Sequence, residues 1–291
     1  LIYKLKLFSF ELITVFTTMT IYNFKKVELC IIIPCYNNLS GLLNSIKSIY
    51  YDNDKYVILV VDDGSFDPIS FQEIKINLPD VHNLILIAND TNIGITKTLN
   101  NALQYVYDNL NVTYIARLDC GDSCTPDRFT KQIQYLEQHL DTHLIGSWCY
   151  FKNNINGKGY KYVTPIEDKS ITRSMHSRNV FIHPTVMWRV KEFDQIKYPD
   201  QFPFAEDYGL FYYMISKAKS AIIGEFLVTC EINNSGLSIH NRSIQLKSRI
   251  KVITIYSTNK LYYFMGVIKI KLLMLIPYKN ILNIKNIIYK F

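Results

Sequence analysis

Two carboxylates follow a short apolar run in the middle of the chain, in the stretch YIARLDCGDSCTPDR. The run over residues 114–118 is typical of a buried strand, and Asp119 and Asp122 come after it with Gly121 between them. Asp and Gly are common turn residues, so one interpretation is a simple turn. The other is a cation site, because paired carboxylates at the carboxyl end of a parallel strand can hold a divalent metal ion and its phosphates.

Polar residues also follow two earlier apolar runs. The run 29–33 is stopped by Pro34 and followed by Asn37, and the run 56–61 is followed directly by Asp62 and Asp63. Runs rich in β-branched residues between polar flanks predict strands that are covered on both faces. In open α/β sheets, ligands bind outside the carboxyl ends of the strands, which favours a binding site over a set of unrelated turns.

The elements that must position these residues alternate between strand and helix from about residue 29 to residue 140. Apolar residues at helical spacing predict helices after the first, third and fourth strands, the last of them starting near Pro126. This alternation predicts an α/β domain with a mainly parallel sheet and right-handed crossovers.

The segment 141–230 is less regular. Residues 143–151 are predicted to form a strand and residues 153–163 a hairpin or loop, while 181–190 is predicted to be a strand with Pro184 at an edge or bend. The stretch FAEDYGLFYYMISKA predicts an amphipathic helix that begins with Glu206 and Asp207. Two acids at a helix start complement the helix dipole, which is the structural alternative to a catalytic role.

The motifs occur in the order IIIPCYNN, VVDDGSFD, NDTNIGITKTLNNA, YIARLDCGD, RFTKQIQYLEQH, IHPTVMWR and FAEDYGLF. This series resembles the family-2 inverting glycosyltransferases of the GT-A fold, especially bacterial enzymes that build surface polysaccharides. The resemblance covers about residues 29–219. It implies a Rossmann-like α/β fold with a mixed, mainly parallel sheet flanked by helices. It also implies transfer of a sugar from a nucleotide donor, with a UDP-sugar as the expected class.

The resemblance implies a nucleotide site at the strand ends. Asp63 is expected to accept a hydrogen bond from the uracil ring, and Asp62 to orient the same loop. Further nucleotide-facing residues are expected in the loop after the first strand, at the diphosphate and at the ribose. These are Pro34, Tyr36, Asn37, Lys97 and Asp119.

A Mn²⁺ or Mg²⁺ ion is expected beside the diphosphate, because a cation can neutralise the charge of the nucleoside diphosphate leaving group. The expected ligands are Asp119, Asp122 and His240. The chain departs from the usual D-x-D pattern because Gly121 stands where a direct ligand is common. Either Asp122 takes over that position, or phosphates and water hold the metal.

The catalytic base is expected to be Asp207, because the family places an E-D pair at this point of the chain. In an inverting transfer, a carboxylate takes the proton of the acceptor hydroxyl during a single displacement. Glu206 is expected to hold the acceptor or position the helix. His183 is expected to face the acceptor or donor sugar, and a buried, hydrogen-bonded structural histidine is the alternative.

The net charge of +7 is concentrated at the carboxyl-terminal end. No Asp or Glu follows Glu231, whereas ten Lys and Arg residues do, so the first 231 residues carry a net charge of −3. The expected division is an extension at 1–24, which need not be native before Met19, a GT-A domain at 25–235 and a basic amphipathic helical tail at 236–291. The tail is expected to lie on an anionic membrane surface, with packing on the domain and a membrane span as alternatives.

The expected location is therefore the cytoplasm, peripherally on the inner face of the cell membrane, with a lipid-linked or growing glycan as acceptor. The six cysteines form no C-x-x-C pair and are expected to be reduced, mostly buried thiols rather than zinc ligands. A non-catalytic nucleotide-sugar or glycan-binding relic and a sugar-nucleotide pyrophosphorylase are the alternative functions. No nucleic-acid-binding motif accompanies the basic tail, so a nucleic-acid partner is not expected.

Overall fold

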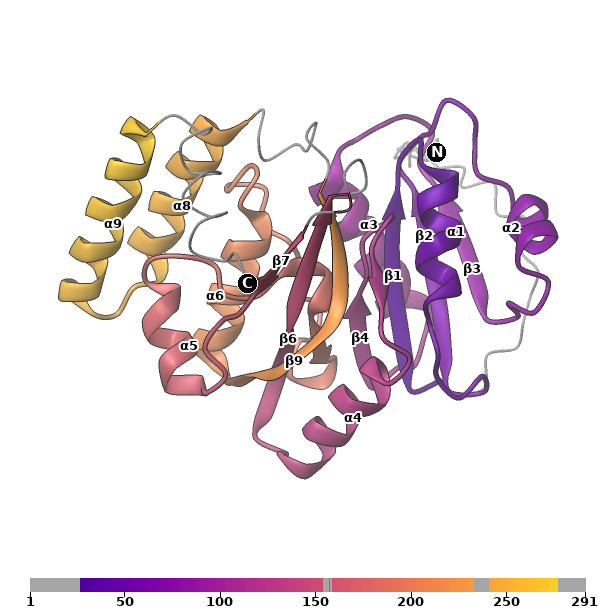
Figure 1. The fold of residues 1–291 in the computed structure, drawn as a ribbon, viewed down its shortest axis with the longest axis horizontal. Helices are drawn as coiled ribbons and strands as arrows, with labels where there is room; N and C mark the ends of the chain where they lie inside the picture. Colours follow the sequence, from indigo (N-terminus) through magenta and orange to yellow (C-terminus); the bar gives the residue numbers. More distant parts are fainter. Residues whose placement is uncertain (1–26, 154–156, 158, 233–240, 277–291) are drawn as a thin grey trace, which may run out of the picture.

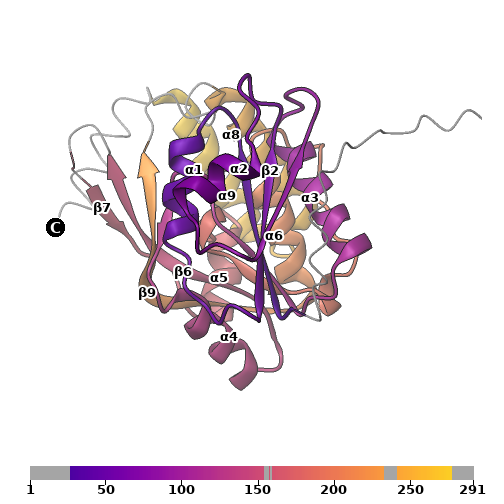
Figure 2. The ribbon, with the colours of Figure 1, turned by 90° about the vertical axis from the view of Figure 1, so that its right-hand side faces the viewer.

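A mixed β-sheet with helices on both faces forms the body of the protein in a computed structural model that describes residues 27–153, 157, 159–232 and 241–276 (Figures 1 and 2). The strand order over these residues is β3-β2-β1-β4-β8-β6-β9-β5, and β7 pairs with β6. The strands are β1 (Leu29–Cys35), β2 (Tyr56–Asp62), β3 (Leu84–Ala88), β4 (Tyr114–Arg117), β5 (Ser123–Cys124), β6 (Thr142–Asn153), β7 (Gly159–Tyr162), β8 (Met187–Arg189) and β9 (Lys219–Ile232). The α-helices are α1 (Leu39–Lys47), α2 (Phe71–Asn77), α3 (Ile95–Asn109), α4 (Arg128–Gln138), α5 (Asp168–Met175), α6 (Glu206–Lys217), α8 (Arg242–Tyr256) and α9 (Lys260–Leu275).

The first half of the sheet is parallel, as predicted. β1 pairs in parallel with both β2 and β4, and β2 pairs in parallel with β3. Its strands are buried on both faces because successive side chains alternate between two cores. In β1, Ile31 and Ile33 pack with α1 and α4 on one face, whereas Cys30 and Ile32 pack with α3 and α6 on the other.

The order in which strands are added to the sheet changes direction after β3. Strands β1, β2 and β3 extend the sheet one way, and β4 then returns to the other side of β1. A crevice opens outside the carboxyl ends of the strands at such a switch point, and ligands of doubly wound folds bind there. The topology therefore marks the ends of β1 and β4 before any side chain is considered.

The second half of the sheet differs from the prediction. The segment 181–190 contains a short 3₁₀ helix (His183–Thr185) and only then the three-residue strand β8, so Pro184 lies in a turn and not within a strand. β8 is also central, since it pairs antiparallel with β4 on one side and β6 on the other. The long strand β9 was not predicted at all, and it pairs in parallel with β6.

The carboxyl-terminal helices pack against the domain. Leu246, Val252 and Ile253 of α8 are buried in the same core as α3 and α6. α9 lies beside α8 at the end of the molecule farthest from α2 (Figure 1). None of the helices that the structure describes is long and apolar enough to cross a membrane.

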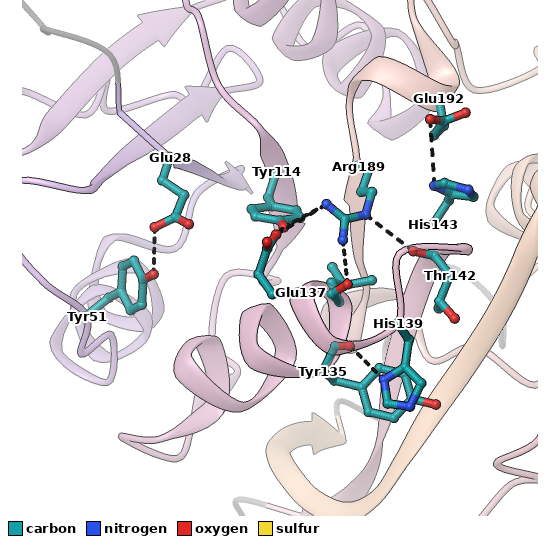
Figure 3. A network of polar contacts seen from close by, with 11 residues as sticks. Glu28, Tyr51, Tyr114, Tyr135, Glu137, His139, Thr142, His143, Arg189 and Glu192 are labelled. Carbon is teal, nitrogen blue, oxygen red and sulfur yellow. Dashed lines mark hydrogen bonds and ion pairs between the residues drawn. The ribbon is translucent and has the colours of Figure 1, made fainter.

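A polar network closes the opposite, amino end of the parallel strands (Figure 3). The Arg189 guanidinium donates to the Tyr114 hydroxyl at 2.9 Å and pairs with Glu137 at 3.3 Å, and it also donates to the Leu136 carbonyl. Its Nε reaches the Thr142 carbonyl at 3.4 Å. These contacts hold α4 and β6 against β4 and β8, so this end of the sheet is tied together and the opposite end carries the candidate site.

Candidate active site

A cavity of about 430 Å³ opens at the carboxyl ends of β1 and β4, where the topology predicts a crevice. Six of the residues singled out in the sequence line it: Pro34, Tyr36, Asp119, His183, Glu206 and Asp207. They come from four separate parts of the chain, so their meeting is a result of the fold and not of sequence proximity.

The loop after β1 is fixed by Asn37. This residue has a φ of 51°, which asparagine tolerates better than most residues. Its amide N–H donates to Ser65 Oγ at 2.8 Å, and its side-chain oxygen accepts from the Phe66 amide at 2.8 Å. Asn37 thus joins the loops that follow β1 and β2, and its neighbour Tyr36 lines the cavity.

The two aspartates after β2 hold loops in place. Asp62 is buried and accepts from the Ser65 amide at 3.0 Å and its hydroxyl at 2.6 Å, and from the Ile69 amide. These bonds hold the loop after β2, and the expected role of Asp62 in nucleotide binding stays a prediction. Asp63 accepts from Asn89 and from the Ile93 and Gly94 amides, which fixes the entry to α3.

Asp63 Oδ2 accepts one hydrogen bond from the described residues, at 3.1 Å from the Gly94 amide. A carboxylate oxygen has two lone pairs, so this atom retains capacity for one more donor. The expected contact of Asp63 with a uracil ring stays a prediction.

A buried arginine organises the middle of the cavity. Arg117 is 1% exposed and pairs with Asp119 at 2.8 Å, while its Nε donates to His183 Nε2 at 3.4 Å. The Tyr198 hydroxyl lies 2.8 Å from the same histidine nitrogen. Burial and the neighbouring Arg117 charge lower the pKa of His183 to about 3, so the imidazole is neutral at physiological pH.

The acid pair lies at the start of α6. Asp207 accepts from the Asn179 side-chain amide at 2.9 Å and from the Tyr208 amide at 2.7 Å. Burial raises the pKa of Asp207 to about 6, and burial together with the charge of Asp207 raises the pKa of Glu206 to about 7. No described residue donates to the buried Glu206 Oε2. Carboxylates poised near neutral pH in a cavity are suited to accept protons.

Asp122 does not lie in the cavity. Its side chain is buried, and Oδ1 accepts from the Glu231 amide at 2.8 Å, so it anchors the end of β9. Gly121 has a φ of +102° and leaves the turn without a side chain at the usual ligand position. Over the residues that the structure describes, no three His, Cys, Asp or Glu side chains gather closely enough to hold a metal ion by themselves.

Lys97 and His240 have different outcomes. Lys97 is exposed on α3 and is absent from the cavity wall. His240 lies outside the described residues. Both assignments stay predictions from the resemblance.

Three contributors were missed. Arg117 could have been noticed, since it is a charged residue inside a run that otherwise reads as a buried strand. Asn179, which orients Asp207, and Gln245 of α8, which lines the cavity and donates to the Phe204 carbonyl, had no local signal. Gln245 also shows that the predicted tail contributes to the site wall. The predicted boundary between domain and tail, at residue 235, falls outside the described residues.

The six cysteines are all free. Cys35 and Cys120 lie close, with 3.2 Å between their sulfur atoms.

A doubly wound sheet with a cavity at its switch point, an acidic residue after β4 and an acid pair on α6 are together typical of an α/β enzyme whose ligand binds at the carboxyl ends of the strands. The comparisons give the family. Residues 30–196, more than half of the chain, match Glycosyl transferase family 2. The chain belongs to this family and is a glycosyltransferase, as the sequence predicted.

Relatives agree with this assignment. An uncharacterized glycosyltransferase of Methanocaldococcus jannaschii is 29% identical over 209 residues, which cover 70% of each chain. The amylovoran biosynthesis glycosyltransferase AmsE of Erwinia amylovora is 27% identical over 198 residues, which cover 68% of each chain.

Solved structures confirm the GT-A fold. The chain is similar to S. aureus TarS 1-349 in complex with UDP-GlcNAc, with a TM-score of 0.58, 17% identity and coverage of 83% of this chain and 70% of that one. It is also similar to the mannosyltransferase PcManGT of Pyrobaculum calidifontis in complex with GDP-Man and Mn²⁺, with a TM-score of 0.60, 14% identity and coverage of 84% and 69%.

Proposed function

We propose that the protein transfers a sugar from a nucleotide donor, with a UDP-sugar as the first candidate, to a lipid-linked or growing glycan, with inversion at the anomeric carbon. The observation that carries this proposal is the single cavity that joins Asp119 of the nucleotide side to Glu206 and Asp207 of the acid pair. A donor that spans the two would present its diphosphate to the first and its anomeric carbon to the second.

The reaction is a single displacement. The acceptor oxygen attacks the anomeric carbon, the bond between that carbon and the diphosphate oxygen breaks, and the nucleoside diphosphate leaves with the bonding electrons. Asp207 takes the acceptor proton. Its two hydrogen bonds, from Asn179 and Tyr208, fix the carboxylate, and the raised pKa of Asp207 matches a base that works near neutral pH.

His183 is assigned a positioning role and not a proton-transfer role. Its contacts with Arg117 and Tyr198 hold the ring at the cavity wall, and its lowered pKa makes it a poor base. Arg117 in turn holds Asp119 in the orientation in which it is to meet the ribose or the metal.

A divalent cation, Mn²⁺ or Mg²⁺, fits the chemistry of this corner, since carboxylate oxygens are the ligands both ions prefer. When bound, it would offset the negative charge of the leaving diphosphate. Asp119 is the residue of the described set that would hold it from the nucleotide side, because its carboxylate is partly exposed at the cavity.

The transfer experiment compares the wild type with Asp207→Asn. The assay follows nucleoside diphosphate release from a panel of nucleotide sugars, with a membrane lipid extract as acceptor. Loss of the base is expected to lower the rate about 10²–10⁴-fold while the affinity for the nucleotide stays within about twofold. Glu192→Gln, a change at an exposed carboxylate outside the cavity, is the control.

Equal transfer rates for the wild type and Asp207→Asn would contradict the assignment of Asp207 as the base. Nucleotide binding without turnover of any donor in the wild type would instead favour the non-catalytic relic, which Gly121 keeps open as a second candidate. The family match argues against the pyrophosphorylase alternative.

Attachment to the cytoplasmic face of the membrane is part of the proposal. α9 exposes one apolar stripe, which we call the α9 stripe: Leu261, Phe264, Met265, Ile268, Leu272 and Leu275. At about 100° per residue these positions fall within roughly a third of the helix circumference. Lys260 and Lys271 lie at one border of the stripe and Lys269 at the other, as in helices that lie in the plane of an anionic membrane.

The opposite face of α9 is packed. Gly266 and Ile270 are buried, and the helix contacts α8. Packing on the domain and contact with lipid are therefore compatible, because they use different faces. Binding to anionic vesicles tests this part of the proposal.

A further inference from the structure

The missing side chain at Gly121 leaves a space that another residue fills. A Cβ atom on Gly121 would lie 2.8 Å from Glu231 Oε2, at the end of β9. The carboxylate oxygens of an aspartate lie about 2.4 Å from its own Cβ, given standard bond lengths. The Glu231 carboxylate thus reaches the immediate surroundings of position 121, although it is 110 residues away in the chain.

The end of β9 is held beside this turn by two sets of bonds. β5, two residues after Gly121, pairs antiparallel with Val228 and Thr229 of β9. The Glu231 amide donates to Asp122 Oδ1 at 2.8 Å. Asp122 therefore holds Glu231 in place. This role explains why the Asp122 side chain is buried.

Glu231 lies beside the candidate active site. It lines a second cavity of about 470 Å³, and this cavity shares Tyr36 and Asn38 with the cavity that contains Asp119. The wall of the second cavity is polar, with Asn37 and Asn44 among its residues. The two cavities therefore adjoin at Tyr36 and Asn38.

The charges around the turn are unbalanced. Arg117 pairs with Asp119, but in the part of the chain that the structure describes no Lys or Arg pairs with Glu231. An exposed carboxylate at the mouth of a site that must accept a diphosphate repels that ligand unless a cation lies between them. A cation held between the carboxylate and the diphosphate would remove this repulsion.

We propose that Glu231 supplies the carboxylate that position 121 lacks, and holds the divalent cation of the donor together with Asp119. The inference rests on the proposed function, since the diphosphate oxygens and water would complete the coordination. It explains how a protein in whose described residues no three metal ligands converge could still use a metal: the donor supplies the missing ligands.

Metal binding is measured with the purified full chain and Mn²⁺. The free Mn²⁺ signal in electron paramagnetic resonance is followed as protein is added, with and without UDP. The variants are Glu231→Gln, which keeps the size of the side chain, and Asp119→Asn. The control is Glu225→Gln, on the same strand, where the carboxylate pairs with Lys131 away from the site.

In the wild type, UDP is expected to tighten Mn²⁺ binding. Both Glu231→Gln and Asp119→Asn are expected to weaken Mn²⁺ binding in the presence of UDP about 10- to 100-fold, because even indirect partners of a metal ligand cost this much. Glu225→Gln is expected to behave as the wild type. Calorimetric UDP binding in EDTA is expected to be the same for Glu231→Gln and the wild type, which also shows that the variant is folded.

Unchanged Mn²⁺ binding in Glu231→Gln would overturn the inference and leave the transferase proposal intact. UDP binding with no metal dependence in the wild type would have the same result. If the wild type binds neither UDP nor GDP, CDP, ADP and dTDP, the proposed donor site itself fails, and the inference falls with it.

Discussion

At the scale of single residues, the fold gives each predicted acid a distinct role. Asp62 and Asp122 hold backbone amides, Asp119 pairs with a buried arginine, and Asp207 is fixed by two hydrogen bonds. Sequence spacing indicated that carboxylates would gather at the strand ends. It could not tell which of them faces the cavity, because the direction of a side chain in a turn depends on local backbone angles such as the φ of Gly121.

The acid pair predicts the pH dependence of transfer. The base must be deprotonated, and burial raises the pKa of Asp207 to about 6 and of Glu206 to about 7. We expect kcat/KM to fall as the pH drops from about 7 to 6. Titration of His183 is not expected to change kcat/KM in this range, because its pKa is about 3. A profile that is flat down to pH 5 would contradict the assignment, and a limb that moves in Glu206→Gln would show that the two acids titrate as a pair.

The same shifts determine how Asp207→Asn affects stability. A carboxyl whose pKa is raised by folding contributes stability below its unfolded pKa, near 4, and loses that contribution as the pH rises through its folded pKa, near 6. At pH 8 the wild type therefore carries the cost of a buried charge. The Asn variant is expected to be as stable or more stable, by on the order of 1 kcal/mol, in thermal unfolding. If Asp207→Asn instead unfolds at a much lower temperature, its loss of activity could not be attributed to the loss of the base.

At the scale of the elements, the parallel strands and β6 were predicted well, whereas β8 was predicted too long and β9 was not predicted. β1 and β2 are continuous apolar runs, which is the pattern of strands buried on both faces. β9 gives no such signal, since its burial pattern is irregular and its pairing with β6 shifts register between Ser147 and Cys149. Irregular pairing breaks the two-residue period on which recognition of a strand depends.

A glycine in α9 predicts how firmly the carboxyl-terminal helices are attached. A Cβ on Gly266 would overlap the carbonyl oxygen of His176, so α9 approaches the end of α5 by way of this residue. Gly266→Ala is expected to push the helices apart and lower the free energy of unfolding by about 1–3 kcal/mol. Gly224→Ala, where the nearest atoms would lie 3.5 Å from the new Cβ, is the matched control in denaturant titrations. Equal midpoints for the two variants would show that α9 is held loosely.

At the scale of the whole molecule, the charge asymmetry of the sequence and the α9 stripe agree. Vesicles that contain anionic lipid are expected to bind the full chain more tightly than neutral ones, by about 1 kcal/mol for each lysine near the surface. Phe264→Asp with Ile268→Asp is expected to weaken binding at least about tenfold, because it removes apolar area and adds negative charge. Ile76→Asp, at an exposed position on α2, is the control.

Sedimentation with vesicles separates the possible occupants of the stripe. Lipid-independent self-association that disappears in the double variant would point to a second copy of the chain and would contradict the membrane proposal. Equally tight binding to neutral and anionic vesicles would support membrane contact through the α9 stripe. It would contradict an electrostatic role for the lysines.

The assembly of the cavity from early and late stretches of the chain has a consequence for how the protein diversifies. Tyr36, Arg117 and Asp119 all precede residue 120, whereas the acid pair and Gln245 follow residue 200. Under the proposed function, substitutions in the later stretch would change the acceptor while the earlier stretch keeps the same activated sugar. Recombination between related genes near the middle of the sequence would then create new linkages from existing donors, without a new nucleotide pocket.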